Sequence, residues 1–423
     1  MDKKYTIFLT GATGLLGSYL LKLFLGNDHK VYVLARSKKD KSAKERVYDY
    51  VRFWDESPLP PFLAYHCEQS EAISENASTS RRGQGEGSFS SFAGSTGESR
   101  ICYTEKRNGP RSRQTKSEST KGTKEHLLTI VEGDITFPQL GIKSKKLQDE
   151  LTSEIEVIYH SAALAKLRAP WDIIYKINVE GTKNVFDFAL QCQKKGNLKK
   201  VNHISTAYVA GTAGDIDFTE DMFDLGQGFN NVYEQTKYEA ECLVREFQKT
   251  NAIPIAIFRP SLVMGDSKEG KTTDFHLFYE PLRFFNQELF NEFPIDRNLN
   301  ENLINIDTVG NAMYLLGEDI DDSVYHITSP ENTNVGFFMD LASEYFGFKL
   351  PRLIELNKFS FDNWTPVQKV LAEPFIPYFN YKTRFISEKT QSILKKKDFL
   401  CPKIDGQNFT EIFAYCRKRD FIS

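Results

Sequence analysis

The stretch from Tyr5 to Leu25, YTIFLTGATGLLGSYLLKLFL, contains a short apolar run, three evenly spaced glycines and an amphipathic segment in immediate succession. Tyr5 to Leu9 is rich in strand-forming residues, and the later apolar residues recur at the spacing of one helix face. Gly11, Gly14 and Gly17 fall on the turn between them. Bare backbone N–H groups at a helix start bind a pyrophosphate, and glycines let the phosphates approach closely. The stretch therefore favours a dinucleotide site over a glycine turn without a ligand.

The composition favours a globular enzyme. Of 423 residues, 40% are hydrophobic and 13% aromatic, which suffices for a large core, and a net charge of −3 gives no general attraction to nucleic acid. No apolar run is long enough to span a membrane, and the N-terminal run meets Gly11 too early for a signal peptide. The six cysteines form no CxxC pair, so we expect no metal site and a cytoplasmic location.

The second predicted strand, Val31 to Ala35, ends in Arg36, with Ser37, Lys38 and Lys39 behind it. In dinucleotide folds this strand end meets the adenosine ribose. An acidic residue there accepts from the 2′-hydroxyl, whereas an arginine can hold a 2′-phosphate. The sequence therefore favours NADP(H) over NAD(H), with a solvated basic loop as the alternative interpretation.

Strands and helices continue to alternate, which predicts a doubly wound parallel Rossmann sheet. Four more strands are expected within 126–136, 156–160, 199–205 and 254–258, and a further one near Val324. Residues 66–124 are rich in Ser, Gly, Glu, Lys and Arg, and we interpret them as a disordered insert. The predicted domains are an NAD(P)-binding domain over 1–270 and a smaller, mainly helical substrate lobe over 271–423.

Three side chains fit the reduction of a carbonyl. Tyr233 and Lys237 lie four residues apart on a predicted helix, so they share one face. A nearby ammonium lowers the pKa of a phenol, which lets it exchange protons with the carbonyl oxygen. Thr206 follows the strand predicted over 199–205 and can donate a second hydrogen bond to that oxygen. By itself the YxxxK spacing is common on surface helices, and the order of all three features is what favours a site.

Other conspicuous side chains have a structural interpretation. His160 and His203 lie in apolar strands, and we interpret each as a hydrogen-bonded core residue. The aromatic residues of DFHLFYEPLRFF, residues 274–285, suit an acyl chain, but clusters of this kind more often form core.

The motifs TGATGLLG, HISTAYV, YEQTK and FRPSLVMGDSKEG together resemble extended short-chain dehydrogenases, and within them the thioester reductase branch. That branch includes the terminal reductase domains of carboxylic acid reductases and nonribosomal peptide synthetases, and the fatty acyl-CoA reductases called male-sterility proteins. The resemblance covers Tyr5 to Asp307 without the insert. One departure is Glu269, which stands where the branch's GDSxTG motif usually has Thr.

The resemblance implies a role for each residue that matches a family motif. Thr206, Tyr233 and Lys237 would take the catalytic places. The cofactor-binding positions would be Gly11, Thr13, Gly14, Leu15, Leu16, Gly17, Arg36, Asp134, Ile135, Ala162, Ala163, Asn178, Ser205, Tyr233, Lys237, Arg259, Pro260 and Ser261.

We therefore expect an NADPH-dependent reductase that converts an acyl thioester, bound to CoA or to an acyl carrier protein, to an aldehyde or alcohol. Two alternatives stay open. One is an extended short-chain dehydrogenase acting on a sterol or a nucleotide sugar, although epimerases of that type retain NAD, which Arg36 disfavours. The other is a nonenzymatic NADP-sensing regulator, which the presence of both Tyr233 and Lys237 disfavours.

Overall fold

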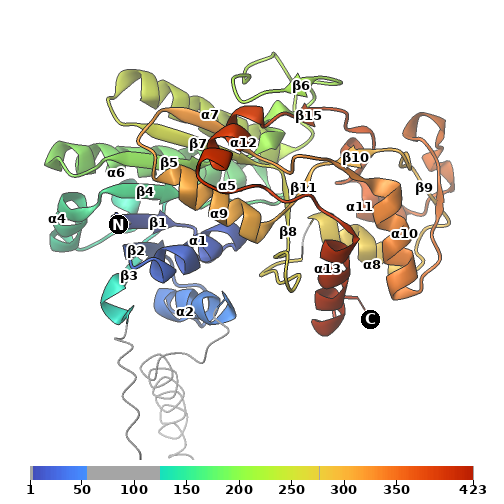
Figure 1. The fold of residues 1–423 in the computed structure, drawn as a ribbon, viewed down its shortest axis with the longest axis horizontal. Coiled ribbons are helices and arrows are strands. Elements are labelled where there is room, and N and C mark those ends of the chain that lie inside the picture. The colour runs from blue at the N-terminus through green and yellow to red at the C-terminus, as the bar shows by residue number, and fades with distance from the viewer. Residues whose placement is uncertain (1–2, 55–123, 276, 423) are drawn as a thin grey trace, which may run out of the picture. The chain divides into compact units, whose positions relative to one another are not determined.

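The computed structural model describes residues 3–54, 124–275 and 277–422 (Figure 1). The predicted opening unit is present as β1 (Thr6–Thr10), α1 (Leu15–Gly26) and β2 (Lys30–Ala35), followed by α2 (Ala43–Trp54). The predicted insert lies outside the described residues, apart from Lys124 at its end.

A seven-stranded sheet has the order β12-β7-β5-β4-β1-β2-β3, and every neighbouring pair is parallel. Chain order runs outward from β1 in both directions, which confirms the predicted doubly wound Rossmann sheet. In such sheets a ligand binds beyond the carboxyl ends of the strands, where the order reverses. Here that point lies between β1 and β4. The other strands are β3 (Leu128–Glu132), β4 (Val157–His160), β5 (Lys200–Ile204), β7 (Ile255–Pro260) and β12 (Ser323–Ile327).

Helices cover both faces of this sheet because successive strand residues point to opposite sides. Ile7 and Leu9 of β1 pack in one cluster with α1, α2 and α9 (Ile306–Gly317), whereas Phe8 packs in a second cluster on the other face. The helices of that second cluster are α4 (Lys145–Glu154), α6 (Gly181–Lys195) and α7 (Val232–Thr250).

The helix after β4 contains an irregular turn. α5 (Trp171–Tyr175) continues through a π-helical turn over Lys176–Glu180 into α6. π-helical turns are rare, and those that occur inside α-helices are often found at functional sites. Here the π-helical turn contains Asn178.

A second core, rich in aromatic side chains, forms after β7. Phe278, Tyr279 and Phe285 are buried in it, with Phe275 and Phe284 packed against it, so the aromatic cluster predicted as core is core. The strands of this region are β8 (Leu262–Met264), β9 (Glu292–Phe293), β10 (Asn300–Glu301), β11 (Leu303–Asn305), β13 (Thr333–Asn334), β14 (Arg352–Leu353) and β15 (Arg384–Phe385), which pairs with β6 (Asp217–Phe218). Its helices are α8 (Glu280–Asn286), α10 (Val335–Phe346), α11 (Pro366–Ala372), α12 (Glu388–Lys396) and α13 (Gly406–Lys418).

Both sides of the predicted boundary at residue 270 contribute to the sheet. α9 and β12 follow that boundary, yet β12 is an edge strand of the sheet and α9 packs on α1. The division into 1–270 and 271–423 therefore stays a prediction.

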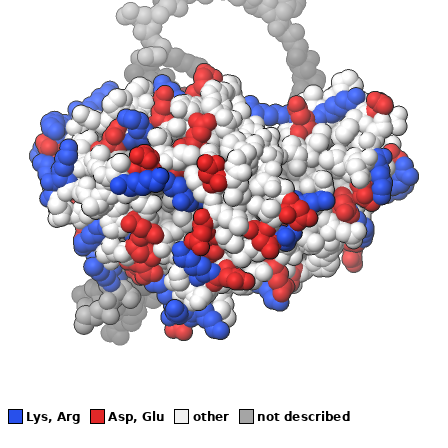
Figure 2. All heavy atoms as spheres, turned by 90° about the horizontal axis from the view of Figure 1, so that it is seen from above, with Lys and Arg blue, Asp and Glu red and all other residues white. Residues whose placement is uncertain are grey.

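On the face shown in Figure 2, acidic and basic side chains are interspersed, without a large region of one sign. Within the described ranges, no helix is both long and apolar enough to cross a membrane.

The contact between α9 and α1 gives a first prediction. A Cβ at Gly310 would overlap the ring of Tyr19, which is itself buried against Trp54. Gly310→Ala should lower the free energy of unfolding by about 1–3 kcal/mol, measured by urea denaturation. Gly26→Ala is the control, because a Cβ there meets no atom within 4 Å. Equal stability of the two variants would contradict this close packing.

Candidate active site

The glycine turn presses the backbone after β1 against the loop after β4. Gly11 has a φ of +78°, and a Cβ on it would lie 2.6 Å from the backbone nitrogen of Ala162. A Cβ on Gly17 would overlap the carbonyl oxygen of Gly11, and the Gly14 N–H donates to that oxygen at 2.9 Å. The turn therefore requires glycine at Gly11 and Gly17 for close approach, as the sequence predicts.

The N-terminus of α1 fits a pyrophosphate. Its N-cap residue is Gly14, no side chain caps the first N–H groups, and the first turn has no acidic residue. These N–H groups and the positive end of the helix dipole attract an anion. Thr13, Leu15 and Leu16 belong to this same turn, which therefore suits the dinucleotide expected there.

Arg36 and Asp134 lie together at the carboxyl ends of β2 and β3, where the guanidinium Nη1 is 3.0 Å from Asp134 Oδ2. Burial raises the pKa of Asp134, but hydrogen bonds from Thr136 and Arg36 outweigh it, so the pKa lies below its usual value. The Arg36 side chain keeps 53% of its surface exposed. The Arg36 guanidinium is therefore accessible to a bound nucleotide, while its Nη1 is held by Asp134.

Arg46 is a candidate that the sequence analysis missed. Its Nη2 donates to Thr13 Oγ1 at 3.1 Å, and its Nη1 donates to the carbonyl oxygen of Arg36. The sequence signal that could have indicated it is Ser42-x-x-Glu45, a capping pattern that marks the start of α2, the helix that carries Arg46. In the structure the Glu45 carboxylate accepts from the Ser42 N–H at 2.7 Å and so fixes this helix start. Two guanidinium groups therefore flank the edge of the glycine turn.

The structure brings Thr206 and Tyr233 together and places Lys237 beside them. Thr206 follows β5, and its hydroxyl shares a hydrogen bond with the Tyr233 phenol. Lys237, only 3% exposed, donates from Nζ to the carbonyl oxygen of Ile204 at 2.7 Å. Because Ile204 is the last residue of β5, the ammonium is held at the same strand end as Thr206.

The protonation of this group differs from the expectation that Lys237 lowers the Tyr233 pKa. Burial raises the pKa of Tyr233 to about 12, against a lowering by the hydrogen bond with Thr206. Burial also lowers the pKa of Lys237 to about 8, against a raising by the Glu241 carboxylate. For Tyr233 the Glu234 carboxylate raises the pKa further, so the phenol is held protonated.

Asn178 connects the π-helical turn to α7. Its Oδ1 accepts from the Leu164 N–H at 2.7 Å, and its Nδ2 donates to Thr236 Oγ1 at 3.0 Å. Leu164 belongs to the loop after β4, next to Ala162 and Ala163. Asn178 therefore connects the loop that contains the predicted cofactor residues Ala162 and Ala163 to the helix that carries Tyr233.

Arg259 lies in a buried network behind the strand ends. Its guanidinium donates to the Glu241 carboxylate at 2.6 and 3.2 Å, and Ser205 Oγ donates to the same carboxylate at 2.7 Å. The Arg259 side chain is fully buried. These contacts fix the backbone just before Thr206, and the cofactor contacts predicted for Ser205 and Arg259 stay predictions.

Two other predicted cofactor residues lie at the end of β7. Pro260 accepts from Thr206 Oγ1 at 3.4 Å through its carbonyl oxygen. Ser261 Oγ is 2.6 Å from Asn302 Oδ1. Ile135 follows β3, at the other end of the strand order, and is buried in the core, where its carbonyl oxygen accepts from Asn184 at 2.7 Å.

The two core histidines differ. His160 is bonded at both ring nitrogens, to Thr10 Oγ1 at 2.8 Å and Thr182 Oγ1 at 3.0 Å, as expected. His203 is also buried, but neither ring nitrogen has a hydrogen-bond partner among the described residues. The prediction of a hydrogen-bonded His203 was therefore wrong, because its ring packs against the rings of His160 and Phe186 and not against a hydrogen-bonding group.

The C-terminal segment contributes an unpredicted contact to α7. Tyr378 Oη donates to Glu234 Oε1 at 2.5 Å and accepts from Asn231 Nδ2 at 2.6 Å. Asn231 is the N-cap of α7, and its side chain accepts from the Glu234 N–H. Tyr378 therefore holds the turn of helix that presents Tyr233.

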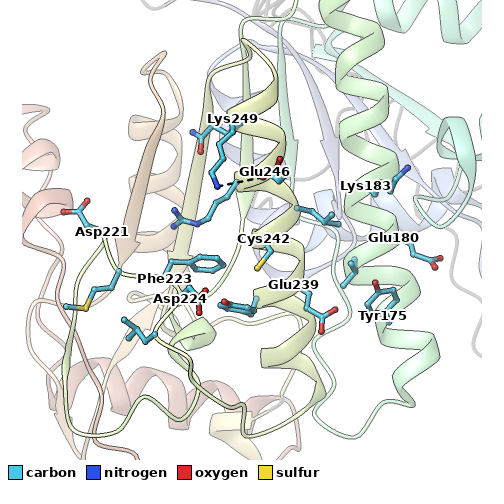
Figure 3. A pocket seen from close by; sticks show the side chains of 17 residues that line it. Tyr175, Glu180, Lys183, Asp221, Phe223, Asp224, Glu239, Cys242, Glu246 and Lys249 are labelled. Carbon is cyan, nitrogen blue, oxygen red and sulfur yellow. Dashed lines mark ion pairs between the residues drawn. The ribbon is translucent and has the colours of Figure 1, made fainter.

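A surface pocket of about 1080 Å³ lies on another face of α7 (Figure 3). Tyr238, Glu239 and Cys242 line it from α7, opposite Tyr175 and other side chains of the α5–α6 segment. Thr206, Tyr233 and Lys237 do not line this pocket, so the pocket and the predicted catalytic group are distinct. Within the described residues, no group of three His, Cys, Asp or Glu side chains could hold a metal ion.

The chain belongs to the family described as Male sterility protein, whose profile matches residues 9–59 and 94–313. It therefore contains the NAD(P)-binding domain of this family of oxidoreductases. The family resemblance predicted from the sequence motifs is confirmed.

Similar proteins include a carboxylic acid reductase of Segniliparus rugosus, 26% identical over 62% of this chain, and the probable fatty acyl-CoA reductase 4 of Arabidopsis thaliana, 26% identical over 51%. The matched regions span 18% and 55% of the length of these relatives. A similar solved structure is the terminal R domain of the myxalamid PKS-NRPS pathway, with a TM-score of 0.71. It is 21% identical, covering 100% of this chain and 93% of that chain, and confirms the fold.

The Tyr378 contact gives a second prediction. Tyr378→Phe removes the hydroxyl that bonds Glu234 and the N-cap of α7, so the free energy of unfolding should fall by about 1–3 kcal/mol. Tyr345→Phe is the matched control, because its ring packs on Phe346 and Phe413 and its hydroxyl has no hydrogen-bond partner among the described residues. Chemical denaturation of both variants tests this, and an unchanged Tyr378→Phe variant would rule the contact out as a stabilising one.

Proposed function

We propose that this protein is an NADPH-dependent reductase of acyl thioesters. The observation that carries the proposal is the meeting of Thr206, Tyr233 and Lys237 beyond the carboxyl end of β5, on the side of the sheet where the glycine turn lies. The bound nicotinamide would supply a hydride to the carbonyl carbon of the substrate.

Each of the three side chains has a role in this proposal. The carbonyl oxygen gains negative charge as its carbon accepts hydride, and a neutral phenol can donate a proton to it. Burial holds Tyr233 in that protonated form. Thr206 would hold the oxygen in place, and the Lys237 ammonium would stabilise the phenolate left on Tyr233 after proton transfer.

The reaction balances with one hydride from NADPH and one proton from Tyr233, which solvent then replaces. Hydride adds to the carbonyl carbon and the Tyr233 proton to its oxygen, which gives a hemithioacetal. The carbon–sulfur bond then breaks, the hydroxyl proton passes to the sulfur, and an aldehyde and a thiol leave. A second hydride and proton would convert the aldehyde to an alcohol.

Two kinds of support favour a thioester substrate. Relatives of the chain are named carboxylic acid reductase and fatty acyl-CoA reductase, and a similar solved structure is a thiolation-reductase di-domain of an archaeal nonribosomal peptide synthetase. The substrate we propose is therefore an acyl group on coenzyme A or on a carrier protein.

The choice of NADPH rests on the arginines beside the glycine turn. Arg36 and Arg46 come from different elements, and Arg46 contacts both Thr13 and the backbone of Arg36. A guanidinium matches the geometry and charge of a phosphate, so the pair favours a 2′-phosphate over a ribose hydroxyl.

A third prediction concerns the proton donor. Tyr233→Phe should bind NADPH as the wild type does but lose at least about 100-fold in kcat, because no group replaces the phenolic proton. NADPH oxidation with an acyl-CoA measures turnover, and a fluorescence titration measures binding. Tyr238→Phe, on the pocket face of α7, should keep full turnover; a Tyr233→Phe enzyme that does the same would remove the mechanism.

A fourth prediction concerns cofactor choice. Arg36→Ala and Arg46→Ala should each weaken NADPH binding by about tenfold or more and leave NADH binding within about twofold, because only NADPH carries the 2′-phosphate. Arg52→Ala on the same helix, where Arg52 pairs with Asp49, is the control. If both cofactors lose affinity equally, the arginines act on the fold and do not read the phosphate.

A further inference from the structure

Glu301 is a half-buried residue whose carboxyl group the proposed chemistry does not use. It ends β10, opposite Thr333 of β13. The next residue, Asn302, contacts Ser261, which the family motif places beside the nicotinamide. Glu301 is therefore one residue from the segment expected to border the reacting end of the cofactor.

The Glu301 side chain also lies close to the catalytic group. Its neighbour is the Tyr208 hydroxyl, which hydrogen-bonds to the carboxyl group. The Tyr208 N–H donates to Thr206 Oγ1 at 3.3 Å. Tyr208 thus contacts Thr206 through its backbone N–H and Glu301 through its side-chain hydroxyl, so one residue connects the end of β5 to this carboxyl group.

One oxygen of this carboxyl is unpaired. Glu301 Oε1 is shielded from solvent and accepts no hydrogen bond from the described residues. The ring of Tyr208, which contacts the carboxyl group, packs against the rings of Tyr381 and Phe385, with centroid distances of 5.5 and 5.2 Å. Burial raises the pKa of Glu301 to about 8, against a lowering by the Tyr208 hydrogen bond.

An acceptor left unpaired in a buried site is unfavourable, and a partner that donates a hydrogen bond to it is stabilising. A ligand that brings an N–H or O–H group to Oε1 removes this cost. A purely aliphatic ligand leaves it in place, so the site discriminates between the two.

We propose that Glu301 is a substrate-recognition residue, whose carboxyl group accepts a hydrogen bond from an N–H or O–H group near the reacting carbonyl of the thioester. The inference rests on the proposed function. The donor has two possible sources with the same chemistry: the amide of the pantetheine-type arm on the sulfur side, or a hydroxyl or amide on the acyl chain.

Three hexanoyl-length thioesters separate these sources. The N-acetylcysteamine thioester carries a donor on the sulfur side only, the S-butyl 3-hydroxyhexanoyl thioester carries one on the acyl side only, and S-butyl hexanethioate carries none. NADPH oxidation gives KM for each with the wild type, Glu301→Ala and Glu301→Gln. Glu344→Ala, an exposed glutamate of α10, is the control.

Glu301→Ala should raise KM about tenfold or more for a donor-bearing thioester and leave KM for S-butyl hexanethioate within about twofold. Glu301→Gln, whose amide oxygen still accepts, should restore most of the affinity. The thioester that loses affinity identifies the source of the donor. An equal rise for all three thioesters, or no rise for any, would overturn the inference.

Binding separates this inference from the proposed function. Calorimetry with the wild type in the presence of NADP⁺ gives the affinity of each thioester without turnover, because NADP⁺ cannot donate a hydride. If a donor-bearing thioester binds about tenfold tighter than S-butyl hexanethioate but NADPH is never oxidised, the proposed function fails and the recognition stands. If turnover occurs but all three thioesters bind equally, the role of Glu301 is refuted.

Discussion

The close approach of two backbone segments at the glycine turn determines where everything else in the site lies. Gly11 is pressed against Ala162, and Gly17 against Gly11, so the turn after β1, the loop after β4 and the start of α1 form one rigid contact. This contact leaves the N–H groups of α1 without side-chain caps. The same constraint therefore orders the core of the sheet and leaves an anion site open at its edge.

The remaining parts of the site converge on this edge because all seven strands are parallel. Arg36 and Asp134 follow β2 and β3, and Thr206 follows β5. α7 packs on this sheet, and Lys237 of α7 donates a hydrogen bond to the carbonyl oxygen of Ile204 at the end of β5. Tyr378 holds the first turn of α7 from the C-terminal segment, so the proposed proton donor is fixed from both sides.

Local sequence patterns were sufficient for the Rossmann sheet and for the order of the predicted catalytic group. The strand–glycine–helix stretch and the YxxxK spacing each depend on neighbouring residues only, and both gave correct elements. The capping pattern at Ser42 and Glu45 marks only the start of the helix that carries Arg46. The contacts of Tyr378 and Glu301 depend on residues far apart in the chain, and no local pattern indicated them. Protonation was also out of reach, because desolvation of Tyr233 and Lys237 depends on everything packed around them.

The central claim is that a hydride is transferred to the carbonyl carbon of a thioester held at Tyr233. Its most direct test uses NADPH deuterated at C4 of the nicotinamide, with an acyl-CoA as substrate and mass spectrometry of the product. The account predicts an aldehyde or alcohol that carries deuterium at C1, together with free coenzyme A. Release of coenzyme A without deuterium in the product, or no product from any acyl thioester, would contradict it.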